Sequence, residues 1–325
     1  MKENRSGKLI SFTTIGNLIN METAIILLST YNGEKYLKEQ IDSIFSQKNV
    51  EIKLLVRDDG SNDNTLSILH DYKTCLNDKI EIIEGKNIGW RKSFFRLLDH
   101  ASKHYRQYKY FAFSDQDDIW LPNKIERALH MFHSSLDQPS LYCSNLYYYK
   151  DGVNHGLIRN YSVIPTYKNC LVRNHVTGCT IVFNRELLDI IGKNPPQINI
   201  AHDYWMYMVA QLCGKVIIDD EAFILYRQHD NNQIGFRKGI INVWKRRLST
   251  ILQSFKEHER ETLAKELLTC LDGKMCLEAK KSVNKIATYR CSLKNKLSLI
   301  FDLDYTLGKK SNDFWLRLRI LFNAL

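Results

Sequence analysis

Apolar runs and amphipathic segments alternate along the first half of the chain. Five runs rich in Ile, Leu, Val, Phe and Tyr predict strands at 24–29, 52–56, 80–83, 108–113 and 141–148. Between them, apolar residues recur with the 3.6-residue period of a helix, at about 36–45, 65–72, 90–101 and 122–132. Because helical connections join parallel neighbouring strands, this order predicts an α/β fold with a mainly parallel sheet flanked by helices on both faces.

The alternation weakens after Tyr149. A polar loop to about Asn169 is followed by predicted strands at 179–183, 216–218 and 223–227 and by a helix at 203–213. From about Gly239 the pattern is helical and basic. We therefore expect an unpatterned leader at 1–20, a main domain at 21–235 that divides near 150, and a basic helical C-terminal region at 236–325.

Composition and charge narrow the class of protein. Hydrophobic residues make up 44% and charged residues 25% of the chain, which is ordinary for a globular protein and excludes a disordered one. Residues 236–325 hold 19 Lys and Arg against 9 Asp and Glu, whereas the preceding 235 residues hold 27 of each. All of the net charge of +10 therefore belongs to the C-terminal region. We expect a cytoplasmic protein, because no apolar run reaches the length of a membrane span and the eight cysteines show no paired spacing.

Polar and acidic turns follow three of the predicted strands. Ser29–Gly33, Arg57–Ser61 and Ser114–Asp118 stand at the ends where ligands bind in open α/β sheets. The third turn carries Asp115, Asp117 and Asp118, and three clustered carboxylates are tolerated where a divalent cation neutralises them. Oxygen ligands favour Mg²⁺ or Mn²⁺ bound together with substrate phosphates, although a surface turn is the simpler alternative.

The residue sequences of these turns resemble those of a known family. Ser-Thr-Tyr-Asn-Gly after the first strand, Asp-Asp-Gly-Ser-Asn-Asp after the second, Asn87-Ile88-Gly89, and Asp-Gln-Asp-Asp before Trp-Leu-Pro are similar to family 2 glycosyltransferases of GT-A fold. The resemblance covers about residues 22–235, and it implies that the domain at 21–235 is a GT-A catalytic domain with a nucleotide-sugar half to about 150 and an acceptor half after it. Within the family, Phe113–Trp120 resembles the rhamnosyltransferase-like members of bacterial polysaccharide pathways.

This resemblance implies roles for individual residues. Asp117 would be a metal ligand, with Asp115 as the first carboxylate of the Asp-x-Asp motif and Asp118 sharing ribose or metal contacts. Asp203 would be the catalytic base that takes the proton from the acceptor hydroxyl; its alternative is a helix cap. The other implied donor-binding residues are Thr30, Tyr31, Asn32, Asp58 or Asp59, and Gly178 beside the sugar.

Residues 226–232 follow an apolar strand and resemble the family segment that closes over the donor phosphates. His229 is the candidate for a late metal ligand, and a loop position is the alternative. Arg227 is the alternative partner of the phosphates, because a guanidinium binds them in a bidentate manner. At the catalytic position itself the chain departs from the family, since His202 precedes Asp203 where Glu is frequent.

The implied activity is an inverting, Mn²⁺- or Mg²⁺-dependent transfer of a sugar, best guessed as L-rhamnose from dTDP-L-rhamnose, to a glycan or lipid-linked glycan acceptor. A nucleotidyl- or phosphotransferase that uses the same acidic site, or a non-catalytic sugar-binding module, are the alternatives. The basic, apolar tail predicts peripheral contact with the inner face of the cell membrane, and packing on the core is its alternative. No nucleic-acid recognition motif accompanies the basic residues.

Overall fold

The computed structural model describes residues 21–132, 137–159, 164–229 and 259–325. The predicted leader and the first part of the predicted C-terminal region lie outside the described residues. The N-terminal half follows the predicted alternation, with the elements β1 (Thr23–Thr30), α1 (Leu37–Phe45), β2 (Glu51–Asp58), α2 (Thr65–Leu76), η1 (Asn77–Lys79), β3 (Ile80–Glu84), α3 (Trp90–His104) and β4 (Tyr110–Ser114). These four strands are parallel and lie in the order β3-β2-β1-β4.

The second half continues the same sheet on the β4 side. It contains β5 (Ile119–Trp120), α4 (Lys124–Phe132), β6 (Ser140–Lys150), β7 (Val153–Leu157), η2 (Gly178–Thr180), β8 (Ile181–Asn184), α5 (Arg185–Lys193), α6 (His202–Cys213) and β9 (Lys215–Arg227). Strand β8 lies antiparallel between β4 and β6, and β9 runs parallel to β6 and antiparallel to β5. The full order is β3-β2-β1-β4-β8-β6-β9-β5, with β7 paired to β6.

Three features of the second half differ from the expectation. The strands predicted at 216–218 and 223–227 are one long strand, β9, whose pairing with β6 shifts register twice. Helix α5 was not predicted, although Asn184 caps it by accepting a hydrogen bond from the Leu187 amide. The short strand β7 lies in the segment expected to be a loop, and all its residues are exposed, so no apolar alternation marks it.

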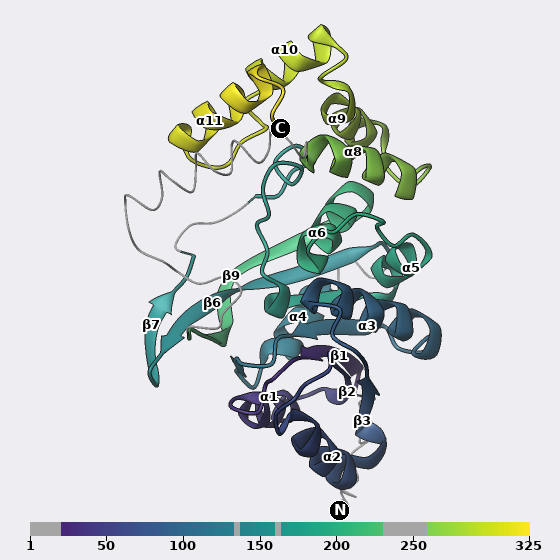
Figure 1. Ribbon diagram of the computed structural model, residues 1–325, viewed down its shortest axis with the longest axis vertical. Coiled ribbons are helices and arrows are strands. Elements are labelled where there is room, and N and C mark those ends of the chain that lie inside the picture. The colour runs from purple at the N-terminus through teal and green to yellow at the C-terminus, as the bar shows by residue number, and fades with distance from the viewer. Residues whose placement is uncertain (1–20, 133–136, 160–163, 230–258) are drawn as a thin grey trace, which may run out of the picture.

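Two apolar layers cover the two faces of the sheet. One contains residues of α1, α2 and α4, such as Ile41, Leu69 and Phe132. The other contains residues of α3, α5 and α6, such as Leu97 and Trp205. Figure 1 shows α3, α5 and α6 stacked along one side of the strands. Alternate residues of β1 face the two layers, so the strand is buried on both faces.

In the described part of the C-terminal region, four helices lie beyond α6, at the end of the molecule opposite α2 (Figure 1). They are α8 (Glu259–Cys270), α9 (Leu277–Thr288), α10 (Leu293–Phe301) and α11 (Lys310–Leu321). Leu316 and Ile320 of α11 belong to the same apolar cluster as α6, and Lys168 Nζ lies 2.8 Å from Asp304 Oδ2 and 3.0 Å from Asp302 Oδ2. The helices are therefore packed against the core that contains α6 and ion-paired to the segment that carries Lys168.

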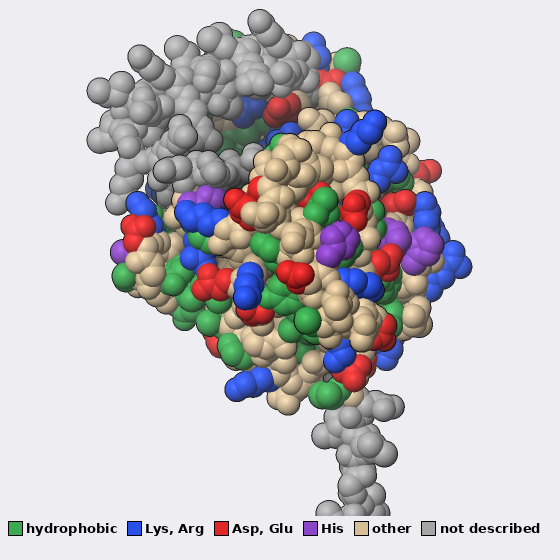
Figure 2. Space-filling view, turned by 60° about the horizontal axis from the view of Figure 1, so that its bottom comes forward, with side chains coloured by type: hydrophobic (Ala, Val, Ile, Leu, Met, Phe, Trp, Pro, Cys, Tyr) green, Lys and Arg blue, Asp and Glu red, His purple; other side chains and the backbone are tan. Residues whose placement is uncertain are grey.

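Among the described helices, none combines the length and apolar character that crossing a bilayer requires. Figure 2 shows that Lys, Arg, Asp and Glu side chains are interspersed over the described part of one face. Opposite charges mixed in this way leave no single-sign field over that face.

Candidate functional site

The carboxyl ends of β1 and β4 are tied together by Gln116. The Thr30 hydroxyl and the Tyr31 amide both donate to Gln116 Oε1, at 2.7 and 2.8 Å, and Gln116 Nε2 donates to the Tyr31 carbonyl at 3.2 Å. The exposed ring of Tyr31 is 43% accessible. Sequence reasoning missed Gln116, although its place between Asp115 and Asp117 marked it as part of the turn.

The β1 and β2 turns are joined by Asn32. Its backbone has a φ of 49°, a left-handed conformation that Asn adopts more readily than most residues. Its amide donates to Ser61 Oγ at 2.9 Å, and its side-chain oxygen accepts from the Asn62 amide at 2.9 Å. Together with the hydrogen bonds of Gln116, these two bonds join the turns after β1, β2 and β4 into one rim.

The two carboxylates at the end of β2 have different tasks. Asp58 accepts hydrogen bonds from the Gly60 and Ser61 amides at 3.0 and 2.9 Å, so it shapes its own turn. Asp59 pairs with Arg57 at 2.5 Å and accepts from the Ile88 and Gly89 amides at 2.9 and 2.8 Å. Both carboxyl groups are buried. Their predicted nucleotide contacts stay predictions.

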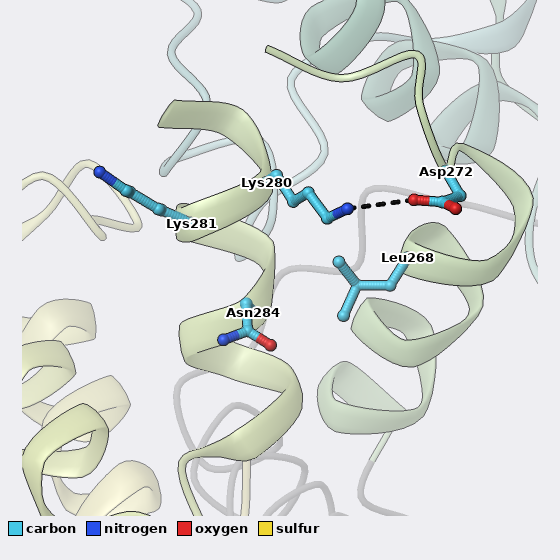
Figure 3. Close-up of a pocket in the computed structure, with 5 residues that line it drawn as sticks. All are labelled: Leu268, Asp272, Lys280, Lys281 and Asn284. Atoms are coloured by element: carbon cyan, nitrogen blue, oxygen red, sulfur yellow. Dashed lines mark hydrogen bonds and ion pairs between the residues drawn. The ribbon is translucent and has the colours of Figure 1, made fainter. Parts of the chain in front are cut away.

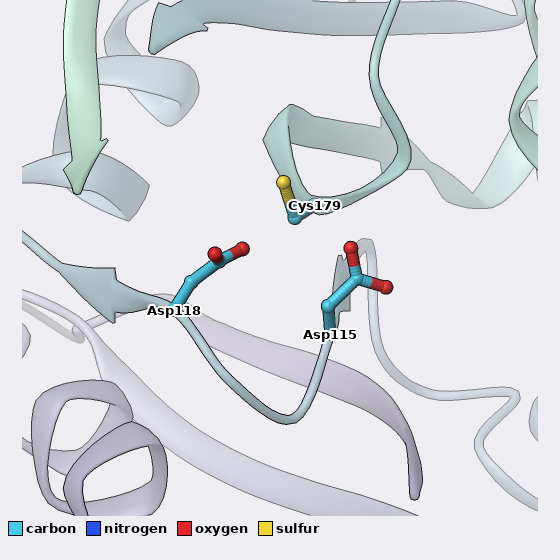
Figure 4. Close-up of side chains that lie close together, drawn as sticks. All are labelled: Asp115, Asp118 and Cys179. Carbon is cyan, nitrogen blue, oxygen red and sulfur yellow. The ribbon is translucent and has the colours of Figure 1, made fainter. Parts of the chain in front are cut away.

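The turn after β4 holds a compact group of acidic side chains and a thiol. Asp115, Asp118 and Cys179 place one oxygen or sulfur atom each within 4.8 Å of one another (Figure 4). Burial, followed by the charges of Asp117 and Asp203, raises the pKa of Asp115 to about 7. Burial and the charges of Asp117 and Asp115 also raise the pKa of Asp118 well above its ordinary value. Such crowding favours a cation at this turn, which would lower both values.

A buried lysine lies close to this group. Lys124 is fully buried, and its ammonium lies 3.7 Å from the ring centroid of Trp120. Burial lowers its pKa to about 7, while Cys179 and Asp118 favour its charged form. Sequence reasoning missed both Lys124 and Cys179, because a lysine in an amphipathic helix and an isolated cysteine carry no signal of their own.

The structure brings the two predicted metal ligands together. His229 Nε2 lies 2.8 Å from Asp117 Oδ2, across 112 residues of sequence, and both side chains are mostly buried. A carboxylate oxygen and an imidazole nitrogen are ligand atoms that Mn²⁺ accepts. The side chains present therefore fit a cation at this point.

Arg227 holds the acidic turn from the end of β9. Its amide donates to Asp118 Oδ1 at 3.1 Å, and its Nε donates to the Asp117 carbonyl at 2.9 Å. The guanidinium pairs with Glu39 at 2.5 Å and lies 4.6 Å from the Tyr36 ring centroid. Arg227 thus fixes the position of Asp117, and its predicted contact with phosphate stays a prediction.

Asp203 lies in the first turn of α6 and faces the acidic turn. Its Oδ2 accepts from Asn174 Nδ2 at 3.1 Å, and its Oδ1 accepts from the Tyr204 amide at 2.7 Å. Burial raises its pKa, and Arg91 opposes that rise. Asp203 is not the cap residue of α6, which is Ala201, but its carboxylate does accept a first-turn amide, so the catalytic role and the helix-cap alternative both stay predictions.

Gly178 and His202 fit together beside Asp203. A Cβ atom on Gly178 would lie 2.9 Å from His202 Nε2 and 3.7 Å from Asp203 Cβ. The His202 ring stacks on Phe94 at 3.8 Å between centroids and contacts Phe113 edge-on at 4.6 Å. Burial lowers the pKa of His202 to about 3, so the imidazole is neutral. The small residue at 178 therefore has a packing reason.

A separate hollow of about 480 Å³ lies between α8 and α9. It is lined by Leu268, Asp272, Lys280, Lys281 and Asn284, and Lys280 Nζ pairs with Asp272 Oδ1 at 3.0 Å (Figure 3). Lys281 points away from this pair in the same view. None of these residues comes from the carboxyl ends of the strands, so the hollow is not part of the candidate site.

Comparison with known proteins identifies the family. The sequence model described as "Glycosyl transferase family 2" matches residues 25–191, which is more than half of the chain. The chain belongs to glycosyltransferase family 2. The match includes the three strand-end turns and Gly178 but ends before Asp203.

Two curated relatives are each similar to more than half of this chain. The dTDP-rhamnosyl transferase RfbG of Shigella flexneri is 34% identical over 218 residues, which are 64% of this chain and 73% of the relative. The UDP-Glc:alpha-D-GlcNAc-diphosphoundecaprenol beta-1,3-glucosyltransferase WfgD of Escherichia coli is 29% identical over 189 residues, which are 56% of this chain and 67% of the relative. Its family makes this chain a glycosyltransferase.

A solved structure supports the fold. The S. aureus TarS 1–349 structure in complex with UDP-GlcNAc has a TM-score of 0.53 at 17% identity, covering 93% of this chain and 80% of the other. At this identity the similarity concerns the fold alone. The predicted GT-A-type α/β fold is confirmed.

Proposed function

We propose that the chain is a metal-dependent, inverting glycosyltransferase that moves L-rhamnose from dTDP-L-rhamnose to a hydroxyl of a growing bacterial surface polysaccharide. The observation that carries the chemistry is the convergence of Asp117 and His229, 2.8 Å apart, with a base candidate, Asp203, whose charge acts on Asp115. Similarity to a rhamnosyl transferase supports the choice of donor. Similarity to a relative named for an undecaprenol-diphosphate acceptor supports a lipid-linked glycan as acceptor.

The proposed roles follow the geometry. Asp117 and His229 hold Mn²⁺ or Mg²⁺, and such a cation, when bound, offsets negative charge on the donor diphosphate and on the departing nucleotide. Asp203 removes the proton from the acceptor hydroxyl as its oxygen attacks the anomeric carbon from the side opposite the diphosphate. The proposed donor-binding residues are Thr30, Tyr31, Asn32, Asp58, Asp59, Asp115, Asp118, Gly178 and Arg227.

A donor screen tests this function. The protein is incubated with dTDP-L-rhamnose, UDP-glucose, UDP-GlcNAc and GDP-mannose in Mn²⁺ and in EDTA, and nucleotide release and products are measured. We expect release of dTDP from dTDP-L-rhamnose, glycoside rather than nucleotide transfer, and an inverted anomeric centre by NMR. Retained configuration would exclude a single displacement, and release unaffected by EDTA would exclude the cation.

The metal site is tested by calorimetry with the donor nucleotide. Asp117→Asn removes one anionic ligand but keeps the size of the side chain, so Mn²⁺-dependent binding of dTDP should weaken at least tenfold. Asp99→Asn, on the exposed surface of α3 where Asp99 pairs with Lys103, is the matched control and should bind normally. Equal Mn²⁺-dependent affinity in the Asp117 variant and the control would move the metal site elsewhere.

Peripheral membrane contact is proposed for the C-terminal helices. They expose large apolar side chains of 59% to 78% accessibility, namely Leu293, Phe301, Leu303, Phe314 and Phe322. Exposed lysines accompany them at 294, 309 and 310. Apolar residues with neighbouring lysines are the combination that binds an anionic membrane interface, where lipid-linked acceptors are found.

A further inference from the structure

A second cavity lies next to the proposed base. Its volume is about 330 Å³, and it is lined by Ser144, Asn145, Leu146, Ile158, Arg159, Arg173, Asn174, His175, Val176 and Thr177. Asn174 both lines the cavity and donates to Asp203 Oδ2 at 3.1 Å. Thr177 leads directly into Gly178. The cavity is therefore one side chain away from the point where the acceptor hydroxyl would react.

The lining of this cavity is basic. It includes two guanidiniums and, among the described residues, no Asp or Glu. Burial, followed by the charges of Arg173 and Arg159, lowers the pKa of His175 to about 4. The nearest carboxylate that an ion pair records is Asp220, which is exposed and lies 3.6 Å from Arg159. Two guanidiniums and one imidazole thus share the lining of this cavity.

Both guanidiniums are held in place by backbone groups. Arg159 Nη2 donates to the Asp219 carbonyl at 2.7 Å, and Arg173 Nη1 donates to the carbonyl of Leu307, which precedes α11. A carbonyl orients a guanidinium without neutralising its charge. Within the described part of the chain, Nε of Arg159 and both ring nitrogens of His175 are buried without a hydrogen-bond partner. An oxyanion can accept hydrogen bonds from Arg159 Nε and from the one N–H of the neutral His175 ring.

We propose that this cavity is an acceptor subsite for an anionic group attached to the sugar that receives the new residue. The group is a phosphate of a lipid-diphosphate linkage or the carboxylate of an acidic sugar, since both present oxygens that two guanidiniums bind in a bidentate manner. The donor diphosphate is already accounted for by the acidic turn and its cation. This inference rests on the proposed function, because it places the acceptor relative to Asp203.

Three probes that share glucose and an octyl chain test the proposal: octyl glucoside, octyl glucuronide and glucosyl octyl diphosphate. Binding is measured by calorimetry below their micelle concentrations and in EDTA, so that no cation can hold a diphosphate at the donor site. We expect at least one anionic probe to bind tenfold or more tightly than octyl glucoside. The tighter anionic probe identifies whether phosphate or carboxylate is the natural group.

Substitutions locate the binding. Arg159→Gln and Arg173→Gln should each weaken the preferred anionic probe by about 10-fold to 100-fold, the range for a charge-assisted hydrogen bond. Arg159→Lys and Arg173→Lys should retain a preference for the anion. Each keeps the positive charge but loses the hydrogen bond to a backbone carbonyl, as the Gln variant at that position does. Arg96→Gln, at an exposed position of α3, is the matched control and should bind as the unchanged protein does.

The outcomes are separable from the proposed function. Equal affinity for the neutral and both anionic probes, or an anion preference that survives both Gln substitutions, would overturn the subsite. If a Gln variant melts at a lower temperature, the Lys variant at the same position is used instead. A folded Lys variant that no longer prefers the anionic probe over octyl glucoside also contradicts a charge-based site. Mn²⁺-dependent binding of dTDP-L-rhamnose by the unchanged protein is measured separately, and its absence would reject the donor assignment whatever the anion result.

Discussion

The three aspartates of the turn after β4 differ because their surroundings differ. Asp118 is buried and accepts the Arg227 amide, Asp117 points to His229, and Asp115 feels the charge of Asp203. The sequence predicted that these carboxylates act together, since their clustering is local. Their partners come from residues up to 112 positions away, and only the fold brings those residues to the turn.

The proposed base gives a prediction at the scale of one residue. Asp203→Asn keeps the size of the side chain but removes its basicity, so the transfer rate should fall about 10²- to 10⁴-fold while donor binding persists. Burial raises the pKa of Asp203, and a base works only when deprotonated. The rate should therefore decline as pH falls through a value above the ordinary aspartate range near 3.9. Stopped assays across pH on both proteins measure this.

The control for that experiment is Asp189→Asn, on α5, where the carboxylate pairs only with Arg185 among the recorded ion pairs. Its rate and pH profile should match those of the unchanged protein. If Asp203→Asn transferred sugar normally with the same acid limb, the base would have to be another carboxylate.

At the scale of elements, local patterns predicted β1 to β4 and their helices well, because each has one consistent period. They failed at β9, where Asp219, Asp220 and Glu221 interrupt the apolar run; these residues fall in a register shift between Ile218 and Ala222, which pair with β6 on either side of them. Asp219 is stabilised there by Arg127 and Tyr142, at 2.8 and 3.0 Å. A pattern of neighbouring residues cannot reveal an ion pair between residues of distant elements.

The contact between η2 and α6 gives a prediction at this scale. Gly178→Ala would place a Cβ 2.9 Å from His202 Nε2, and the ring cannot move freely because it stacks on Phe94. We expect α6 to shift together with Asp203, so stability should fall by about 1 to 3 kcal/mol and transfer should fall more than donor binding. Denaturant unfolding and transfer assays measure the two effects.

A double variant separates this clash from other causes. His202→Ala removes the obstructing ring, so adding Gly178→Ala to it should cost much less stability than Gly178→Ala does alone. Gly152→Ala, on the exposed β6–β7 turn, is unsuitable as a control because its φ of 80° makes any side chain strained there. Gly33→Ala is also unsuitable, since a Cβ would contact Gln116 and Thr30 in the site. Strictly additive losses in the double variant would contradict the packing explanation.

At the scale of the whole molecule, the C-terminal helices lie between the apolar core and the surface. Their inner side is apolar and joins the core through Leu299, Leu316 and Ile320. The same region supplies the Leu307 carbonyl that orients Arg173 at the second cavity. The sequence predicted a helical, basic region here, but the division of its faces between core and surface depends on how the helices pack.

The membrane proposal is tested with vesicles of phosphatidylcholine alone and of phosphatidylcholine with phosphatidylglycerol. Sedimentation should show binding to the anionic vesicles that weakens as salt rises, because each lysine near the surface contributes about 1 kcal/mol that ions screen. Replacing both Phe301 and Leu303, which are 76% and 78% exposed, by Ser should reduce binding at every salt concentration through lost apolar burial. Val153→Ser, at a 54% exposed position of β7, also replaces an exposed apolar side chain by Ser, but outside these helices, and should leave binding unchanged. Binding that is equal for both kinds of vesicle, or that Val153→Ser reduces as much as the paired substitution does, would contradict the assignment of membrane contact to the C-terminal helices.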